Sequence, residues 1–194
     1  FHPAAYGTEK FMDYGFMEAM MRSTVLPARD LWYSEGTINY YYGGQYFAVF
    51  LTKLTGSKVE LTYNLMRTFV AAFAFVLPFS LVRQMSVDRL KGSLTGKKRC
   101  LPAVAGIIAG LSVSIAGNMH YVVYSKVIPW LQKLQGKEAD SYWFPDATRY
   151  IGYNPDVPDK TIHEFPCYSF VLGDLHAHVV NVMFVLFLMG LLYA

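Results

Sequence analysis

The sequence predicts an all-α, polytopic helical membrane protein. Hydrophobic residues make up 54% of the 194 residues, and charged residues make up only 16%. The apolar residues are concentrated in blocks about as long as the hydrocarbon core of a bilayer is thick, so the lipid bilayer is the first expected partner. Because the chain opens at Phe1 without an initiator methionine and ends inside an apolar run, we expect a fragment of a longer protein.

Three membrane spans are expected within a membrane domain at 61–194. Their approximate bounds are 61–82, 101–123 and 175–194 onward. The loop between the first two, residues 83–100, carries six Lys or Arg against one Asp. The positive-inside rule assigns such a loop to the cytoplasm. The loop 124–174 and the segment 1–60 are then expected on the extracytoplasmic face.

The segment 1–60 is expected to carry short helices at the membrane interface. Residues 7–23 predict a helix with acidic residues in its first turn. Glu9 and Asp13 are four residues apart, so both carboxylates lie on one helical face. This pair can share a metal or a proton, or it can be a solvated pair balanced by nearby basic residues. Residues 45–56 are apolar but short, and they predict an interfacial helix.

An aromatic, glycine-rich stretch follows the first expected helix. It runs from Asp30 to Tyr46 and contains Tyr40, Tyr41 and Tyr42 with little apolar periodicity. It predicts a loop that contacts a polar ligand or an interface. The alternative is an aromatic belt at the level of the lipid headgroups.

The densest cluster of ionisable groups is the block HEFPCYSFVLGDLHAH, residues 163–178. Asp174, His176 and His178 alternate, so in an extended segment all three point the same way, whereas on a helix only Asp174 and His178 share a face. Together with Glu164 they predict a site for a divalent cation, with Mg²⁺ or Mn²⁺ expected ahead of Zn²⁺. The alternative is that the carboxylates are stabilised by a helix N-terminus with no ligand at all.

Three blocks resemble a known family. GTEKFMDYGF, DLWYSEGTINYYYGGQYFAVFLTKLTG and HEFPCYSFVLGDLHAH look like the signature blocks of the prokaryotic YYY-domain membrane proteins, named for the run of three tyrosines. That family has no settled activity. The chain departs from the family pattern at His163, where Asn is usual, and at Ala177, where Pro is usual. His163 therefore adds a potential metal ligand that relatives lack.

The order of these blocks is also similar to the first outer loop of GT-C glycosyltransferases, such as the protein mannosyltransferases. Those enzymes transfer a sugar from a polyprenyl-phosphate carrier on the outer face, and an acidic residue of that loop acts as catalytic base or in metal binding. The resemblance implies Glu9 or Asp13 for this role. Asp13 is preferred because it lies deeper in the block, and Asp30 is a third candidate.

Two further residues are expected at the same site. Arg149 lies in SYWFPDATRYIG among aromatic residues, which suits a phosphate at the headgroup level. Its alternative is a surface ion pair with Asp146. His120, at the outer end of the second expected span, is expected to face the same cavity, and its alternative is an interfacial hydrogen bond.

The sequence therefore predicts a multi-pass protein of the prokaryotic plasma membrane with its active face outside the cytoplasm. The expected activity is transfer of a sugar from a polyprenyl-phosphate-linked donor to an unknown acceptor, with no nucleic-acid partner. One alternative is a transporter or channel component whose path is lined by Asn64, Arg67 and Asn118. The other is a metal-dependent envelope hydrolase or assembly protein that uses His163, His176 and His178.

Overall fold

The structure is a computed structural model that describes residues 9–93, 95–153 and 155–194. Within these ranges the regular elements are all helices, and the strand-like pairing is limited to isolated bridges. The α-helices are α1 (Lys10–Arg22), α2 (Gly43–Thr55), α3 (Val59–Arg89), α4 (Leu101–Leu111), α5 (His120–Val122), α6 (Ile128–Leu134), α7 (Pro166–Leu172) and α8 (Ala177–Tyr193). Short 3-10 or π-helical turns cover Gly96–Cys100, Ser112–Ala116, Val123–Val127 and Phe144–Thr148.

Among the described residues, two helical stretches are long and apolar enough to cross a membrane. They are α3, with 31 residues, and Lys98–Ala116, with 19 residues. The apolar helix α8 is shorter, at 17 residues. At about 1.5 Å of rise per residue, 19 residues extend for about 29 Å, close to the thickness of the hydrocarbon core.

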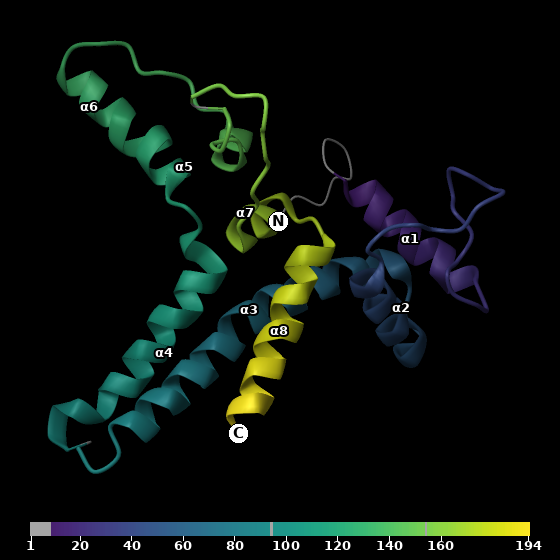
Figure 1. Ribbon diagram of the computed structural model, residues 1–194, viewed down its shortest axis with the longest axis horizontal. Helices are drawn as coiled ribbons and strands as arrows, with labels where there is room; N and C mark the ends of the chain where they lie inside the picture. The colour runs from purple at the N-terminus through teal and green to yellow at the C-terminus, as the bar shows by residue number, and fades with distance from the viewer. Residues whose placement is uncertain (1–8, 94, 154) are drawn as a thin grey trace.

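The three apolar helices lie in one layer (Figure 1). α3 and α4 run antiparallel and side by side, and α8 packs on α3. The start of α3, the far end of the α4 stretch and the start of α8 lie at the same end of this layer. The helices α1, α2 and α7 gather there, and we call it the site end.

Glycines allow α3 and α4 to approach closely. A Cβ atom at Gly106 would lie 2.7 Å from Phe79 O, and one at Gly110 would lie 2.9 Å from Phe75 O. Only glycine fits at these two positions without a shift of backbone. The spacing of four residues places both on the face of α4 that meets α3.

The first apolar block differs from expectation in length. The span expected over 61–82 lies inside a single helix that continues to Arg89, into the loop expected at 83–100. The reason is local, because residues 83–89 contain no glycine or proline that would end a helix. Pro78 lies within α3 without ending it.

The second apolar block is broken, which corrects the single helix expected over 101–123. Helical structure stops at Ala116, because Gly117 has a φ of 53° and Met119 has a φ of 61°. Asn118 holds the break in place: its amide donates to Ala147 O at 2.7 Å, and its side-chain oxygen accepts from the backbone N–H of His120 at 3.2 Å. A second helical stretch then runs from His120 to Leu134, from the end of the expected span into the loop expected at 124–174.

The buried core lies between α1, α2, α3 and α8 at the site end. Met17 and Met20 of α1, Val49 of α2, Val70 of α3 and Val180 of α8 are all at most 2% exposed. Burial of apolar side chains of this size contributes about 1.5–3 kcal/mol each. The two short helices expected in segment 1–60 are therefore packed on the start of α3 and α8, and this packing positions the polar side chains described below.

The glycine contacts between α3 and α4 give a testable prediction. Gly106→Ala should lower the free energy of unfolding by about 1–3 kcal/mol, since the new methyl group meets Phe79 backbone. The measurement is thermal unfolding of the purified protein in detergent. Gly190→Ala in α8 is the matched control, because nothing lies within 4 Å of its Cβ position. Equal stability of the two variants would contradict the close approach of α3 and α4.

Candidate functional site

A buried amide joins the two blocks that the sequence singled out. Gln45, in the first turn of α2, is fully buried, and its Nε2 donates to Asp13 Oδ1 at 2.8 Å and to Leu175 O at 3.0 Å. Gly44 makes this possible, because a Cβ there would lie 2.9 Å from Val180 of α8. The start of α8 is thus held against the acidic face of α1, and Asp13 lies next to the block 163–178.

Asp13 is a fully buried carboxylate with one unsatisfied oxygen. Its Oδ2 has no hydrogen-bond partner among the described residues. Burial raises the pKa of Asp13 to about 6, although the charge of His176 and the bond from Gln45 limit the rise. A carboxyl group with this pKa is ionised at neutral pH and is still basic enough to accept a proton from a ligand.

Three side chains of the block 163–178 converge on one point. Glu164 Oε2 lies 3.4 Å from His176 Nδ1 and 3.4 Å from His178 Nε2. The hydroxyl of Ser169, a buried residue of α7, donates to the same Glu164 oxygen at 3.1 Å. We call Glu164, His176 and His178 the Glu-His-His cluster. These residues come from the segment before α7 and from the start of α8.

Glu9 approaches the cluster from α1. Its Oε2 lies 3.1 Å from His176 Nε2, so His176 is placed between two carboxylates. The hydrogen bond with Glu164 raises the pKa of His176 to about 9 against the opposing effect of burial. Burial is the largest single influence and acts to raise the pKa of Glu164, but the interactions with His176, Ser169 and His178 together outweigh it, so the pKa is lowered. The site therefore attracts positive charge.

Asp174 does not join the cluster, which corrects the ligand set expected from the alternation. It is 4% exposed and lies within electrostatic range of Lys10 and Asp13. The three residues do not form one extended segment, because α8 begins directly after His176 and the chain turns there.

Two buried cations lie near Asp174. Lys10 and Arg67 are each 4% exposed, and burial together with the charge of Arg67 lowers the pKa of Lys10. The guanidinium of Arg67 packs directly against Gly173, whose φ of 78° and lack of a side chain leave room for it. Arg67 Nη1 also donates to Asn64 Oδ1 at 2.8 Å. These contacts attach the turn before Asp174 to α3.

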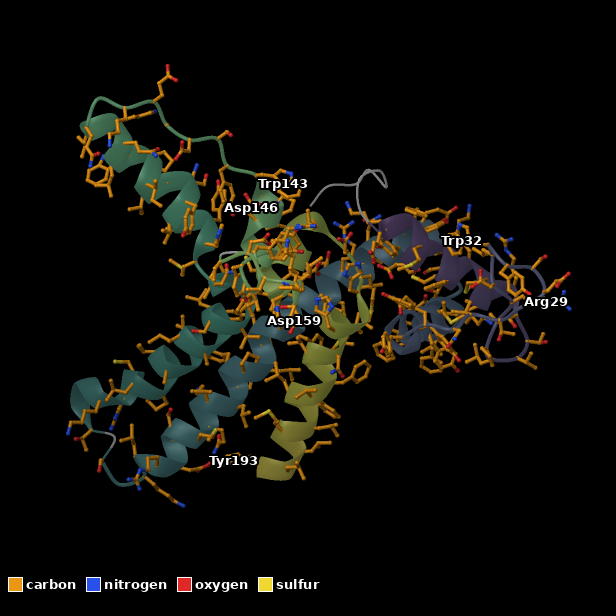
Figure 2. The ribbon with its side chains drawn as sticks, turned by 45° about the horizontal axis from the view of Figure 1, so that its top comes forward. Arg29, Trp32, Trp143, Asp146, Asp159 and Tyr193 are labelled. Carbon is orange, nitrogen blue, oxygen red and sulfur yellow. The ribbon has the colours of Figure 1, made fainter. Side chains whose placement is uncertain are left out.

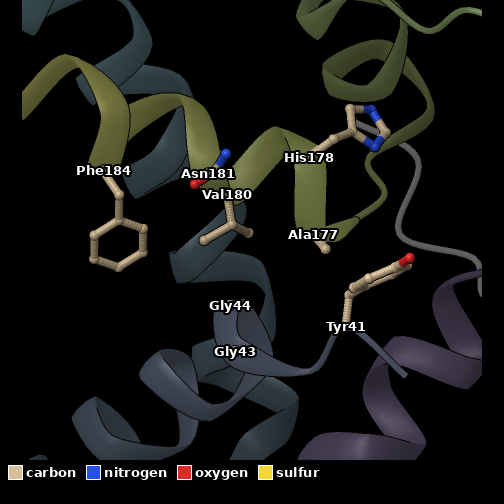
Figure 3. Close-up of a pocket in the computed structure, with 8 residues that line it drawn as sticks. All are labelled: Tyr41, Gly43, Gly44, Ala177, His178, Val180, Asn181 and Phe184. Atoms are coloured by element: carbon tan, nitrogen blue, oxygen red, sulfur yellow. The ribbon is translucent and has the colours of Figure 1, made fainter. Parts of the chain in front are cut away.

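A groove of about 640 Å³ opens beside the cluster (Figure 3). Tyr41, Gly43 and Gly44 line one side, and α8 lines the other from Ala177 to Phe184. Among the three tyrosines, Tyr41 lines the groove, Tyr40 is near enough to Glu9 and Asp13 for their charges to act on it, and Tyr42 packs against the core. The groove runs from a polar end at His178 toward the apolar part of α8.

Asp30 has a local structural role. Its Oδ1 accepts hydrogen bonds from the backbone N–H groups of Trp32 at 2.7 Å and Tyr33 at 3.1 Å, which closes a tight turn. Arg29 and Trp32, on either side of it, lie at the end of the molecule away from Trp143 and Asp146 (Figure 2). Asp30 is thus not brought to the Glu-His-His cluster.

Arg149 lies on the other side of the site. Its Nη1 donates to Pro145 O at 3.0 Å, and its guanidinium lies 4.9 Å from the centre of the Trp143 ring. Within the described part of the chain, the ion pair with Asp146 does not form. Burial and the charge of Glu164 raise the pKa of Tyr168, whereas Arg149 acts to lower it. Tyr168 is thus close to both Glu164 and Arg149.

The remaining histidines make other contacts. His120 Nδ1 lies 3.1 Å from the hydroxyl of Tyr142, and its ring stacks on Tyr124. His163 is exposed, and its Nδ1 lies 3.1 Å from Thr161 Oγ1. Neither belongs to the Glu-His-His cluster.

Four residues of the site were not selected by sequence reasoning: Gln45, Lys10, Ser169 and Gly173. Gln45 carries a weak signal, as a polar residue in the first turn of a short, mostly apolar helix. Its partners are 32 and 130 residues away along the chain, so no local spacing identifies it.

The contact between Gly173 and Arg67 gives a second prediction. Gly173→Ala should lower the free energy of unfolding by well over about 1 kcal/mol, because it combines a strained φ with a collision. Gly136→Ala is the control, since Gly136 has a similar φ of 69° and nothing within 4 Å of its Cβ position. Chemical unfolding in detergent would compare the two, and equal losses would show that Arg67 does not pack on Gly173.

Comparison with known proteins identifies a family but no activity. No curated protein and no solved structure matches the chain significantly. Residues 1–194 match the family described as "Uncharacterized membrane protein (DUF2298)". The match covers every residue of the described site and both helices long enough to span a bilayer. The chain therefore belongs to this family of membrane proteins.

Proposed function

We propose that the chain is part of a membrane-embedded, GT-C-like glycosyltransferase of the YYY-domain type. It would transfer a sugar from a polyprenyl-phosphate-linked donor to an acceptor on the outer face of a prokaryotic plasma membrane. In this topology α3, the α4 stretch and α8 cross the bilayer, and the site end faces away from the cytoplasm. The basic residues between α3 and α4 support this orientation.

The observation that carries the proposal is the buried Asp13 with its unsatisfied Oδ2. An acceptor hydroxyl is a weak nucleophile, so a carboxylate must take its proton as the new bond to the anomeric carbon forms. Asp13 has a pKa suited to this task, and Gln45 fixes its orientation through Oδ1. Glu9 is the weaker candidate for the base, because its carboxylate is 59% exposed and pairs with His176.

The groove along α8 supports a lipid-linked substrate. Its polar end lies at His178, and its other end is lined by Val180 and Phe184. A phosphate at the polar end would leave its isoprenoid chain along apolar surface that continues toward the bilayer. Arg149, with guanidinium N–H groups near Tyr168, is the proposed phosphate ligand at the edge of the site.

Binding of the carrier tests this proposal directly. Polyprenyl phosphate, the common product of such donors, should raise the unfolding temperature of the full-length protein in detergent. At a free lipid concentration of 100 times Kd, binding should raise the free energy of unfolding by about 2.7 kcal/mol. Arg149→Ala should weaken this effect, whereas Lys133→Ala, which removes a cation from α6, should not. Absence of stabilisation at any lipid concentration would contradict the proposed substrate class.

Asp13→Asn should separate a catalytic role from a structural one. A rise of the pKa of Asp13 from 3.8 to about 6 corresponds to about 3 kcal/mol. The folded wild type holds the proton more tightly, so its stability falls as pH rises from about 4 to about 6. Asparagine keeps the bond from Gln45 and carries no charge, so the variant should be the more stable protein at pH 8 while sugar transfer is lost.

The measurement is the unfolding temperature of wild type and Asp13→Asn at pH 4, 6 and 8, together with turnover of lipid-linked sugar. Asp30→Asn is the control, since asparagine can still accept the turn hydrogen bonds of Asp30. Retained turnover in Asp13→Asn would exclude Asp13 as the base. A stability difference that does not grow between pH 4 and 8 would exclude the raised pKa.

A further inference from the structure

We infer that the Glu-His-His cluster is a binding site for a divalent cation that prefers imidazole ligands, with Zn²⁺ the foremost candidate. The ligand atoms are Glu164 Oε2, His176 Nδ1 and His178 Nε2, which all lie within 4.8 Å of one another. The inference concerns the cofactor of the site and holds whether or not the reaction is sugar transfer.

Two distances within the cluster are long for charge-assisted hydrogen bonds and match the spacing of ligand atoms in a coordination shell. Charge-assisted hydrogen bonds between nitrogen and a carboxylate are about 2.7–2.9 Å long. Both histidine nitrogens lie 3.4 Å from Glu164 Oε2. Ligand atoms at about 2.0–2.2 Å from a tetrahedral zinc ion are separated by about 3.4 Å. Two of the three separations in the cluster therefore match those around a bound zinc ion, and the third is at most 4.8 Å.

The carboxylate of Glu9 lies next to the ring nitrogen of His176 that does not face Glu164. Histidines that bind a metal commonly present their other ring nitrogen to a carboxylate or carbonyl, which fixes the tautomer. His176 offers Nδ1 to the cluster, and its Nε2 lies 3.1 Å from Glu9 Oε2. Ser169 orients Glu164 in the same way from α7, through the hydroxyl bond at 3.1 Å. In this arrangement Glu9 is a positioning residue for the metal site.

One side of the cluster is open. The side chain of His178 is 48% exposed and lines the groove next to Tyr41. Three protein ligands with an accessible fourth position are typical of catalytic rather than structural zinc sites. The donor set also changes the order of ions expected from the sequence, because two imidazoles favour Zn²⁺ over the oxygen-seeking Mg²⁺.

Metal content of the purified full-length protein tests the inference without any assay of transfer. After equilibration with ZnCl₂ and removal of free ion, wild type should retain about one zinc per chain. His178→Ala should lose it, and Glu9→Gln should weaken binding about 10–100-fold. His163→Ala is the matched control, because His163 lies in the same block, is exposed, and contacts Thr161 instead of the cluster.

Co²⁺ serves as a spectroscopic substitute for Zn²⁺. This second test uses wild-type protein alone, so it does not require that a variant folds. Visible d–d absorption of intact wild-type protein with Co²⁺, quenched by added Zn²⁺, would support the site. Wild type that retains neither ion would overturn it, as would a loss of metal in His163→Ala equal to that in His178→Ala. Zinc binding without stabilisation by polyprenyl phosphate would retain this inference and reject the proposed function.

Discussion

The site depends on one buried amide. Gln45 Nε2 donates at once to Asp13 of α1 and to the backbone of Leu175, the residue before His176. Removal of this amide would leave the Asp13 carboxylate without its side-chain donor in a place that water does not reach, which costs about 1–3 kcal/mol for the unsatisfied group. The apolar core around it, from Met17 to Val180, holds the amide in place. Packing and polar geometry therefore stabilise each other at the site end.

Composition was sufficient to predict the helices that carry the layer. The apolar block at 61–82 lies in α3, and the block at 101–123 begins with α4. The short helix expected over 45–56 corresponds to α2, because block length and helix propensity are local properties. The break at Gly117 to Met119 was not predictable from hydropathy, since apolar residues continue on both sides of it. It depends on Asn118 and its contact with Ala147, a residue 29 positions further along the chain.

At the site, too, some features follow from local sequence and others depend on contacts between distant parts of the chain. Residue type selected Asp13, Glu164, His176 and His178, because clustered ionisable groups next to apolar helices are costly without a function. Neither an extended segment nor a single helix describes residues 174–178, because α8 begins after His176, and Asp174 is not grouped with the other three ligands. Lys10 and Arg67 lie beside Asp174 instead, and only the packing of α1 against α3 brings them there. The direction of a side chain, and its proximity to residues distant in the sequence, depend on the assembled fold.

The packing of Arg67 against Gly173 bears on when the site can assemble during synthesis of the chain. Asp13 and Glu9 are synthesised more than 150 residues before His176, and α3 enters its place long before the turn at Gly173 exists. Until that turn docks on Arg67, the acidic face of α1 has no histidine or backbone partner from the α8 side. Contacts between such distant parts of a chain carry a large entropic cost of loop closure and slow folding. The Glu-His-His cluster and the partners of Asp13 are therefore brought together only when α8 is in position.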